Sequence, residues 1–74
     1  MSKFYEGLAE ILEIDVSEVT PDLDFSTLTG QQWDSLAVVN TLALIDECYK
    51  KLLKGAELGK CTTVGEVEAL IERY

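Results

Sequence analysis

The residues best placed to do chemistry are Asp34-Ser35-Leu36, where a polar stretch meets the longest segment with helical apolar spacing, residues 36–49. A serine at that point is expected to be exposed, held at the positive end of a helix dipole and flanked by a carboxylate. The chain contains no histidine, so it lacks the usual base that would make Ser35 a nucleophile. The tripeptide therefore indicates a hydroxyl that another enzyme modifies or, as the ordinary alternative, a serine that only begins a helix.

The chain is short and acidic, with 14 acidic and 6 basic residues among 74 and a net charge of −8. Residues 1–48 hold ten of the acidic residues and a single base, whereas residues 49–74 are close to neutral. Nucleic acid and anionic membrane surfaces would repel such a chain. Basic patches on other proteins would attract it. The alternative is that the charge serves only solubility.

The length predicts one small domain over residues 1–74, without room for a deep catalytic cavity and its supporting shell, so we expect no enzyme activity of its own. Cys48 and Cys61 have neither a zinc-binding nor a CxxC spacing, so we expect free thiols in a reducing compartment and no metal. No segment resembles a signal peptide or is long enough to span a bilayer. These features predict a cytoplasmic protein, and nothing in the sequence points to an oligomer, so we expect a monomer.

Apolar spacing predicts a first helix over residues 3–12, with Ser2 able to cap it. A long loop is expected to follow as far as Asp34, because Pro21 disfavours helical geometry at Thr20 and polar residues are dense there. One helical turn is expected near residues 17–19. The apolar residues of this loop should be pinned on the core; they are Ile14, Val16, Val19, Leu23, Phe25 and Leu28.

A second helix is predicted from Ser35 to Tyr49, with Asp34 as its N-cap. Its core stripe is expected to be Val38, Leu42, Ile45 and Tyr49, while Leu36, Val39 and Ala43 form a second apolar stripe that exceeds what one core contact needs. A short turn is expected near residues 55–58. A capping box of Thr63 and Glu66 opens the last helix, in which Val64, Val67, Leu70 and Ile71 face inward. No segment alternates with a period of two, so the expected fold is all-α: three main helices and one short helix joined by a long first loop.

Three stretches resemble the acyl carrier protein family in order and spacing. Residues 14–25 resemble its first loop, Trp33-Asp34-Ser35-Leu36 its attachment motif, and residues 61–67 the start of its last helix. The resemblance runs from the first helix to the end of the chain. It implies that Ser35 carries 4′-phosphopantetheine, transferred from coenzyme A by a phosphopantetheinyl transferase, with Asp34 and Leu36 completing the motif. The thiol of that arm would carry acyl groups as thioesters in fatty acid or polyketide biosynthesis.

The resemblance also implies partner enzymes that load or use the acyl group, such as a ligase, a ketosynthase or an acyltransferase. Carriers that pass cargo onward bind weakly through small interfaces. The residues expected at this interface are Trp33, Asp34, Leu36, Val39, Asp46 and Glu47. The alternatives are a solvated helix face for the charged residues and ordinary core for Leu36 and Val39. Neither nucleic-acid binding nor membrane insertion is expected.

Two features depart from the family pattern. Many fatty-acid carriers have acidic residues just after the serine motif, where this chain has Ala37 and Asn40, which favours a specialised carrier of one dedicated pathway. A cluster of Lys50, Lys51 and Lys54 is unusual in the family; it suits a helix end or an acidic partner. The alternatives left open are a peptidyl carrier, a D-alanyl carrier and a non-carrier helical interaction module. Peptidyl carriers usually have a glycine-rich approach to the serine, where this chain has Gln31-Gln32.

Overall fold

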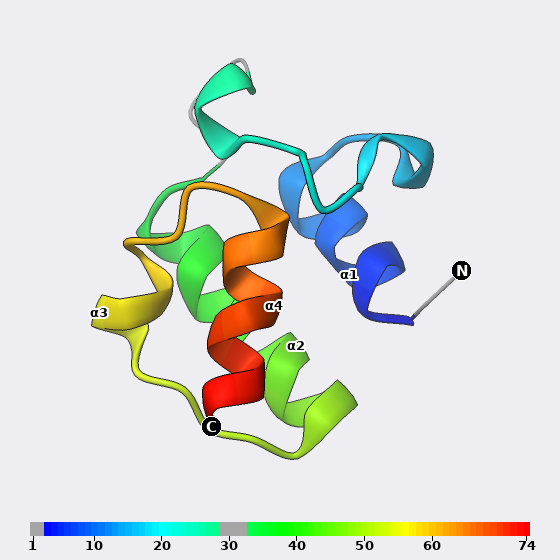
Figure 1. Ribbon diagram of the computed structural model, residues 1–74. Helices are drawn as coiled ribbons and strands as arrows, with labels where there is room; N and C mark the ends of the chain where they lie inside the picture. Colours follow the sequence, from blue (N-terminus) through cyan, green and yellow to red (C-terminus); the bar gives the residue numbers. More distant parts are fainter. Residues whose placement is uncertain (1–2, 29–32) are drawn as a thin grey trace.

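The computed structural model describes residues 3–28 and 33–74 (Figure 1). Within these residues the order of elements is α1 (Lys3–Leu12), η1 (Val16–Glu18), η2 (Phe25–Thr27), α2 (Ser35–Tyr49), α3 (Gly55–Leu58) and α4 (Val64–Arg73), where η marks a 3-10 helix. The predicted all-α bundle of three main helices and one short helix is confirmed. The described residues contain no strand beyond an isolated bridge between Asp24 and Thr63. The predicted cap at Ser2 lies outside them, as do Gln31 and Gln32.

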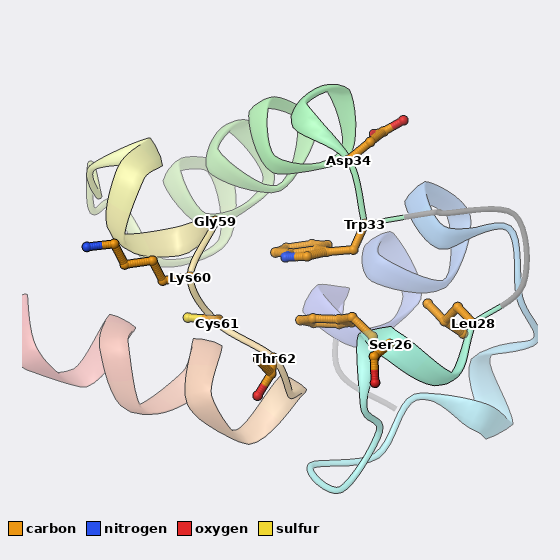
Figure 2. Close-up of a pocket in the computed structure, with 9 residues that line it drawn as sticks. Ser26, Leu28, Trp33, Asp34, Gly59, Lys60, Cys61 and Thr62 are labelled. Atoms are coloured by element: carbon orange, nitrogen blue, oxygen red, sulfur yellow. The ribbon is translucent and has the colours of Figure 1, made fainter.

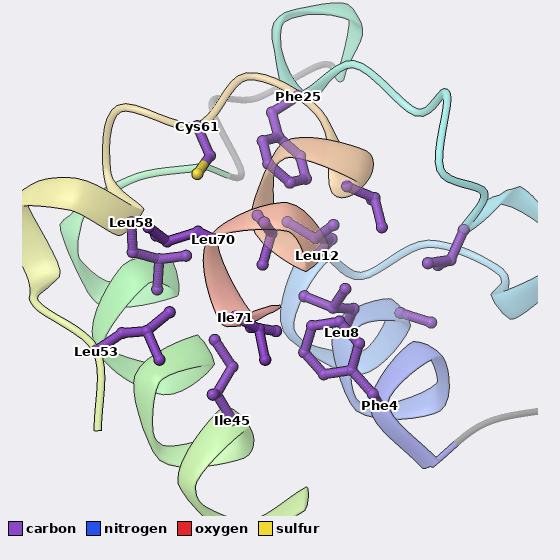
Figure 3. Packing of buried hydrophobic residues seen from close by; sticks show 14 residues of the cluster. Phe4, Leu8, Leu12, Phe25, Ile45, Leu53, Leu58, Cys61, Leu70 and Ile71 are labelled. Atoms are coloured by element: carbon purple, nitrogen blue, oxygen red, sulfur yellow. The ribbon is translucent and has the colours of Figure 1, made fainter. Parts of the chain in front are cut away.

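The core lies between α1, α2 and α4, with α3 closing one side (Figure 3). All four inward-facing residues predicted for α4 are buried. They meet buried side chains from the other elements: Phe4, Leu8 and Leu12 of α1, Ile45 of α2 and Leu58 of α3. Burying a side chain of this size stabilises a fold by about 1.5–3 kcal/mol. These contacts fix the three long helices against one another.

The first loop is tied to the beginning of α4. The Phe25 amide donates to the carbonyl of Thr62 at 2.8 Å, and the Val64 amide donates back to the carbonyl of Leu23 at 3.1 Å. The amide of Gly65 donates to the carbonyl of Pro21 at 2.9 Å, and a Cβ at Gly65 would lie only 3.0 Å from that oxygen. These hydrogen bonds hold residues 21–25 of the loop across the end of the bundle where α4 begins (Figure 1).

The apolar residues of this loop pack as predicted. Val19 and Phe25 are buried, and the other four, Ile14, Val16, Leu23 and Leu28, are partly buried against the core. The expected turn near residues 17–19 is present one residue earlier, as η1. The second turn, η2, was not predicted, because it depends on pairing with a segment almost 40 residues away in the sequence.

The buried face of α2 differs from the predicted stripe. Its centre is Ala37, Thr41 and Ile45, whereas Tyr49 is 40% exposed and meets Phe4 edge-on with 5.4 Å between ring centroids. Val38 and Leu42 are only partly buried. We attribute the rotation to the close approach of α1, since a Cβ at Gly7 would lie 2.5 Å from Leu44 Cδ1. The prediction of Tyr49 as a core residue was wrong.

Of the two hydrogen bonds predicted for the capping box of α4, one is present and the other is displaced. Thr63 Oγ1 accepts a hydrogen bond from the Glu66 amide at 3.1 Å. The Glu66 carboxylate, however, accepts from the amide of Thr62 at 2.7 Å rather than from that of Thr63. The reciprocal half of the capping box was therefore wrong by one residue. Thr63 is extended, with φ −133° and ψ 160°, and pairs with Asp24, which presents the preceding amide to the carboxylate.

Candidate functional site

Ser35 is the first residue of α2, and Asp34 is its N-cap, as predicted. Asp34 Oδ1 accepts a hydrogen bond from the Ala37 amide at 2.9 Å, and the Asp34 carbonyl accepts the first intrahelical bond from Val38 at 3.0 Å. Helix geometry leaves the amides of Ser35 and Leu36 without an intrahelical acceptor. These amides lie at the positive end of a 15-residue helix, and Ser35 is exposed. The site therefore combines an accessible hydroxyl with an electrostatic environment that favours an anion.

An exposed stripe runs along α2 away from Ser35. Leu36 and Val39 are 67% and 59% exposed, so the alternative that they are ordinary core residues was wrong. Ala43 and Asp46 continue the stripe at helical spacing, and both are exposed. Apolar surface of this kind, beginning next to a modifiable hydroxyl and ending in a carboxylate, suits a partner-binding face. We call these four residues the α2 stripe.

Glu47 lies beside the α2 stripe and pairs with Lys3, with 3.2 Å between Lys3 Nζ and Glu47 Oε1. Both side chains are more than half exposed, so the pair contributes little to stability. The carboxylate therefore stays available to a basic partner at small cost. Its partner role stays a prediction.

The structure corrects one comparison with the family pattern. Ala37 is only 4% exposed and faces the core, so in this chain it contributes nothing to the exposed face of α2. Asn40 is exposed. Of the two positions, Asn40 is therefore the one that leaves the exposed face of α2 without a charge.

Trp33, immediately before the N-cap, turns toward the first loop. Its ring stacks on Phe25 with 4.1 Å between centroids and 17° between planes. The side chain is partly buried against the core. The apolar surface expected beside Ser35 is therefore supplied mainly by Leu36, and sequence reasoning missed the stacking because nothing local signals a contact between Phe25 and Trp33.

A surface cavity of about 560 Å³ opens beside this stacked pair (Figure 2). Its lining comes from η2, from the segment before α2 and from the segment between α3 and α4: Phe25, Ser26, Leu28, Trp33, Asp34, Gly59, Lys60, Cys61 and Thr62. Figure 2 shows Trp33 and Cys61 on facing sides of the cavity, with the Asp34 carboxylate pointing away from it. No sequence motif marked this cavity, which we call the Trp33 cavity.

Two buried polar atoms lack a hydrogen-bond partner among the described residues. They are the indole nitrogen Nε1 of Trp33 and the hydroxyl oxygen of Thr41, which is fully buried in the core face of α2. An unpaired buried donor or acceptor costs about 1–3 kcal/mol of folding free energy. The indole lines the Trp33 cavity, whereas the threonine lies within the bundle.

The two cysteines are free, as predicted. Cys61 is buried, and this burial raises the pKa of its thiol above the ordinary value. A raised thiol pKa keeps the sulfur protonated and unreactive near neutral pH. No group of histidine, cysteine and carboxylate side chains able to hold a metal occurs among residues 3–28 and 33–74.

The lysine cluster has a structural explanation at one of its members. Lys51 Nζ donates a hydrogen bond to the Ile71 carbonyl at 3.0 Å, near the negative end of α4. Lys50 has a left-handed backbone with φ 59° where α2 ends, and Lys54 precedes α3. Lys51 therefore serves a helix end, but it is the end of α4 and not, as expected, that of the helix it follows. Contact of the cluster with an acidic partner stays a prediction.

A family model described as the phosphopantetheine attachment site matches residues 2–71. The chain is thus a phosphopantetheine-bearing carrier, a class of domain that is acted on by enzymes and is not itself catalytic. It belongs to the family of phosphopantetheine-bearing carriers, and this match agrees with the resemblance to acyl carrier proteins found in the sequence. The comparison with individual curated proteins found no match.

The described residues fit the prosthetic group of this family, 4′-phosphopantetheine, which is attached covalently. A phosphodiester needs an accessible hydroxyl and profits from nearby backbone N–H groups, and the start of α2 offers both. When bound, the group supplies a flexible arm ending in a thiol that carries cargo as a thioester. No helix among the described residues is both long enough and apolar enough to cross a bilayer.

Proposed function

We propose that this chain is an acyl carrier protein in which Ser35 is the attachment residue for 4′-phosphopantetheine. The observation that carries the proposal is the exposed Ser35 hydroxyl at the first position of α2, directly after an aspartate cap and directly before an exposed leucine. Acyl intermediates are held as thioesters and presented to separate loading and acyl-using enzymes.

Each residue around Ser35 has a distinct task in this proposal. Asp34 fixes the position at which the helix begins, so that the hydroxyl stands clear of the fold. A phosphopantetheinyl transferase must supply the base that activates the hydroxyl, because the chain has no histidine. Leu36 and Val39 offer apolar contact to the enzymes that visit the carrier, and Trp33 contributes to this interface only through the part of its ring that is left exposed beside Phe25.

The charges of α2 set the character of the partner interface. Asp46 and Glu47 attract basic surfaces, while Asn40 leaves the middle of the face uncharged. We infer a specialised carrier, acting as a cytoplasmic monomer in one dedicated pathway. The peptidyl and D-alanyl alternatives share the same attachment chemistry, whereas the match to the attachment-site family disfavours a non-carrier module.

Attachment is tested by incubating the purified protein with coenzyme A and a broad-specificity phosphopantetheinyl transferase, followed by intact mass measurement. The wild-type protein should gain one phosphopantetheinyl group, and Ser35→Ala should gain none. Ser17→Ala is the matched control, because Ser17 is also exposed and lies just after an aspartate cap; it should load as wild type does. Loading that survives Ser35→Ala, or no loading of the wild type, would contradict the proposal.

The cargo class is tested on protein purified from its own cells. Cleaving the thioester and measuring the mass of the released group separates an acyl chain from an aminoacyl or D-alanyl group. Release of an acyl group supports the acyl carrier proposal. Release of an amino acid would replace it with the peptidyl or D-alanyl alternative while leaving Ser35 as the attachment residue.

A further inference from the structure

We propose that residues 50–54, which connect α2 to α3, form a docking site for an extended acidic segment of another protein. Lys50 and Lys54 present positive charge on either side of exposed Leu52. The site lies beyond the C-terminal end of α2, whereas Ser35 is at its N-terminal end. This inference goes beyond the proposed function and does not depend on loading at Ser35.

Exposure alternates along this segment. Lys50, Leu52 and Lys54 are exposed, and Leu52, at 78%, is the most exposed large hydrophobic side chain among the described residues. Between them, Leu53 is buried, and the ammonium of Lys51 donates a hydrogen bond to the end of α4. Alternation with a period of two is characteristic of extended backbone. The segment is therefore fixed to the bundle on one side and uncovered on the other.

The backbone of this segment is able to pair with a partner strand. Among the described residues, the amides and carbonyls of residues 51–53 make no hydrogen bond with another backbone group. An extended peptide can bond to such groups, as a strand does when it adds to an exposed sheet edge. In this mode the backbone supplies affinity, and alternate side chains supply specificity.

Local structure does not account for Lys50 or Lys54. Lys50 has a left-handed backbone, with φ 59°, at the end of α2, a position that glycine normally occupies because a side chain is strained there. Lys54 is the N-cap of α3 but makes no capping hydrogen bond, whereas a serine or an aspartate would. The last turn of α2 has no basic residue, although a lysine there would suit the helix dipole without strain. Two lysines at positions that favour other residue types indicate a use for their charge.

The charge and spacing of the site select an acidic protein segment. No ion pair of Lys50 or Lys54 is present among residues 3–28 and 33–74. In an extended partner, two carboxylates four residues apart lie on the same face, so they can meet the two lysines while an apolar residue midway between them covers Leu52. A membrane fits less well, because the net charge of −8 on the whole chain is repelled by anionic lipid.

A partner docked here leaves the attachment residue accessible. α2 has 15 residues, so its two ends are about 22 Å apart. Figure 1 shows the connection from α2 to α3 at the end of the bundle opposite the first loop. The α2 stripe suits basic partners, and residues 50–54 suit an acidic one. The carrier can therefore be held at one end while an enzyme approaches Ser35 at the other.

The probe is a seven-residue peptide with blocked ends, in which threonines alternate with glutamate, valine and glutamate. Binding is followed in the ¹H–¹⁵N spectrum of the unloaded protein. The amide resonances of residues 50–54 should move on titration, and equally so in Ser35→Ala. A peptide with glutamine in place of both glutamates should bind more weakly. So should a peptide of the same composition with adjacent glutamates, because neighbours on an extended chain face opposite sides.

Two variants remove charge without harming the fold. Lys50→Gly and Lys54→Ser each introduce the residue type that the local backbone favours, so neither should lower the melting temperature. Each should weaken peptide binding about two- to fivefold, the factor expected for one exposed charge pair. Lys60→Ser is the matched control, because it removes the same charge from an exposed lysine outside the segment; it should bind the peptide as wild type does.

The outcomes separate the acidic segment from other occupants. Equal binding of the three peptides, wild-type affinity in both Lys50→Gly and Lys54→Ser, or no movement of the resonances of residues 50–54 would overturn the inference. Movement of these resonances with protein concentration alone would assign the surface to a second copy of the chain. Movement on adding phosphatidylglycerol vesicles but not the peptide would assign it to a membrane. Either result would also overturn the inference, whereas failure to load phosphopantetheine would contradict the proposed function alone.

Discussion

Among residues 3–28 and 33–74, η1, η2 and α2 each begin after an aspartate cap and have a serine at their first or second position, but at α2 alone the cap does not accept a hydrogen bond from that serine. In η1 and η2 the cap accepts a hydrogen bond from the amide of the serine two residues on, Ser17 to Asp15 at 2.9 Å and Ser26 to Asp24 at 2.8 Å. At α2 the cap reaches past Ser35 to the amide of Ala37. An aspartate cap and a nearby serine therefore hydrogen-bond to each other in η1 and η2, whereas at α2 the serine is left exposed.

The difference lies in the position of the serine and in the segment on its C-terminal side. Ser26 also donates its hydroxyl to Asp24 at 2.7 Å, and η2 ends after three residues, anchored by buried Phe25. Ser35 stands at the first helical position of a 15-residue helix and directly precedes exposed Leu36. We call the first loop with η1 and η2, residues 13–28, the closed region, because its serines bond to their caps. We call the start of α2, Asp34 to Val39, the displayed region, because its serine and its leucine are open to other molecules.

The largest loss of stability is expected when Phe25, the buried side chain that anchors η2, is removed. Phe25→Ala should lower the free energy of unfolding by about 3–5 kcal/mol, because the ring is 5% exposed and its loss leaves a cavity. That loss approaches the total stability of a domain of this size, roughly 3–5 kcal/mol. Urea unfolding monitored by circular dichroism measures it. Leu36→Ala, at an exposed position, is the control and should change the free energy of unfolding by less than about 0.5 kcal/mol. Equal losses in the two variants would contradict the claim that Phe25 anchors the fold and Leu36 does not.

A smaller effect is expected at the cap of the displayed serine. Asp34→Ala removes the acceptor for the Ala37 amide and should cost about 0.5–2 kcal/mol. Asp34→Asn keeps an acceptor and should retain most of that stability. The same two variants, assayed with the transferase, should show slower loading for Ala than for Asn, since a frayed helix start no longer holds Ser35 in place. No loss of stability in Asp34→Ala would mean that α2 begins without its cap.

The closed region should also respond to acid. The hydroxyl and then the amide of Ser26 lower the pKa of Asp24 below its ordinary value. A carboxyl whose pKa is lower in the folded state stabilises the fold above its unfolded pKa of about 3.9, and this contribution is lost as the pH falls through the folded pKa. Between pH 6 and pH 3, the melting temperature should therefore fall more steeply for wild type than for Asp24→Asn. Parallel curves for the two proteins would contradict the role given to Asp24.

The smallest stability effect is expected from the displayed serine itself. Ser35→Ala should alter the free energy of unfolding by less than about 0.5 kcal/mol, because its hydroxyl is exposed and the cap is Asp34. Ser26→Ala should be the more destabilising of the pair, since it removes the hydroxyl that donates to Asp24. Thermal unfolding of the two unloaded variants compares them directly. A larger loss for Ser35→Ala would show that Ser35 serves the fold.

The displayed region could be predicted from the sequence, because its signals are local. Asp34 before an apolar periodic segment marks the helix start, and an excess of apolar residues on α2 marked Leu36 and Val39 as candidates for a partner surface. Thr63 likewise marked the start of α4. Each of these judgements depends on residues within one or two helical turns.

The closed region could be predicted only in outline. Its apolar residues indicated that it packs on the core, but η2, the bridge from Asp24 to Thr63 and the stacking of Trp33 on Phe25 depend on segments far apart in the chain. The rotation of α2 that buries Ala37 and exposes Tyr49 has the same origin, since it depends on the close approach of α1. Helical spacing identifies an apolar stripe but does not say which neighbour will cover it.

The most direct test of the central claim is to locate the phosphopantetheinyl group within the chain. The wild-type protein is loaded, digested with a protease and sequenced by fragmentation mass spectrometry. The group should be found on Ser35, with Ser17 and Ser26 unmodified in the same sample. A group on either of those serines, or on any other residue, would contradict the account of Ser35 as the displayed hydroxyl.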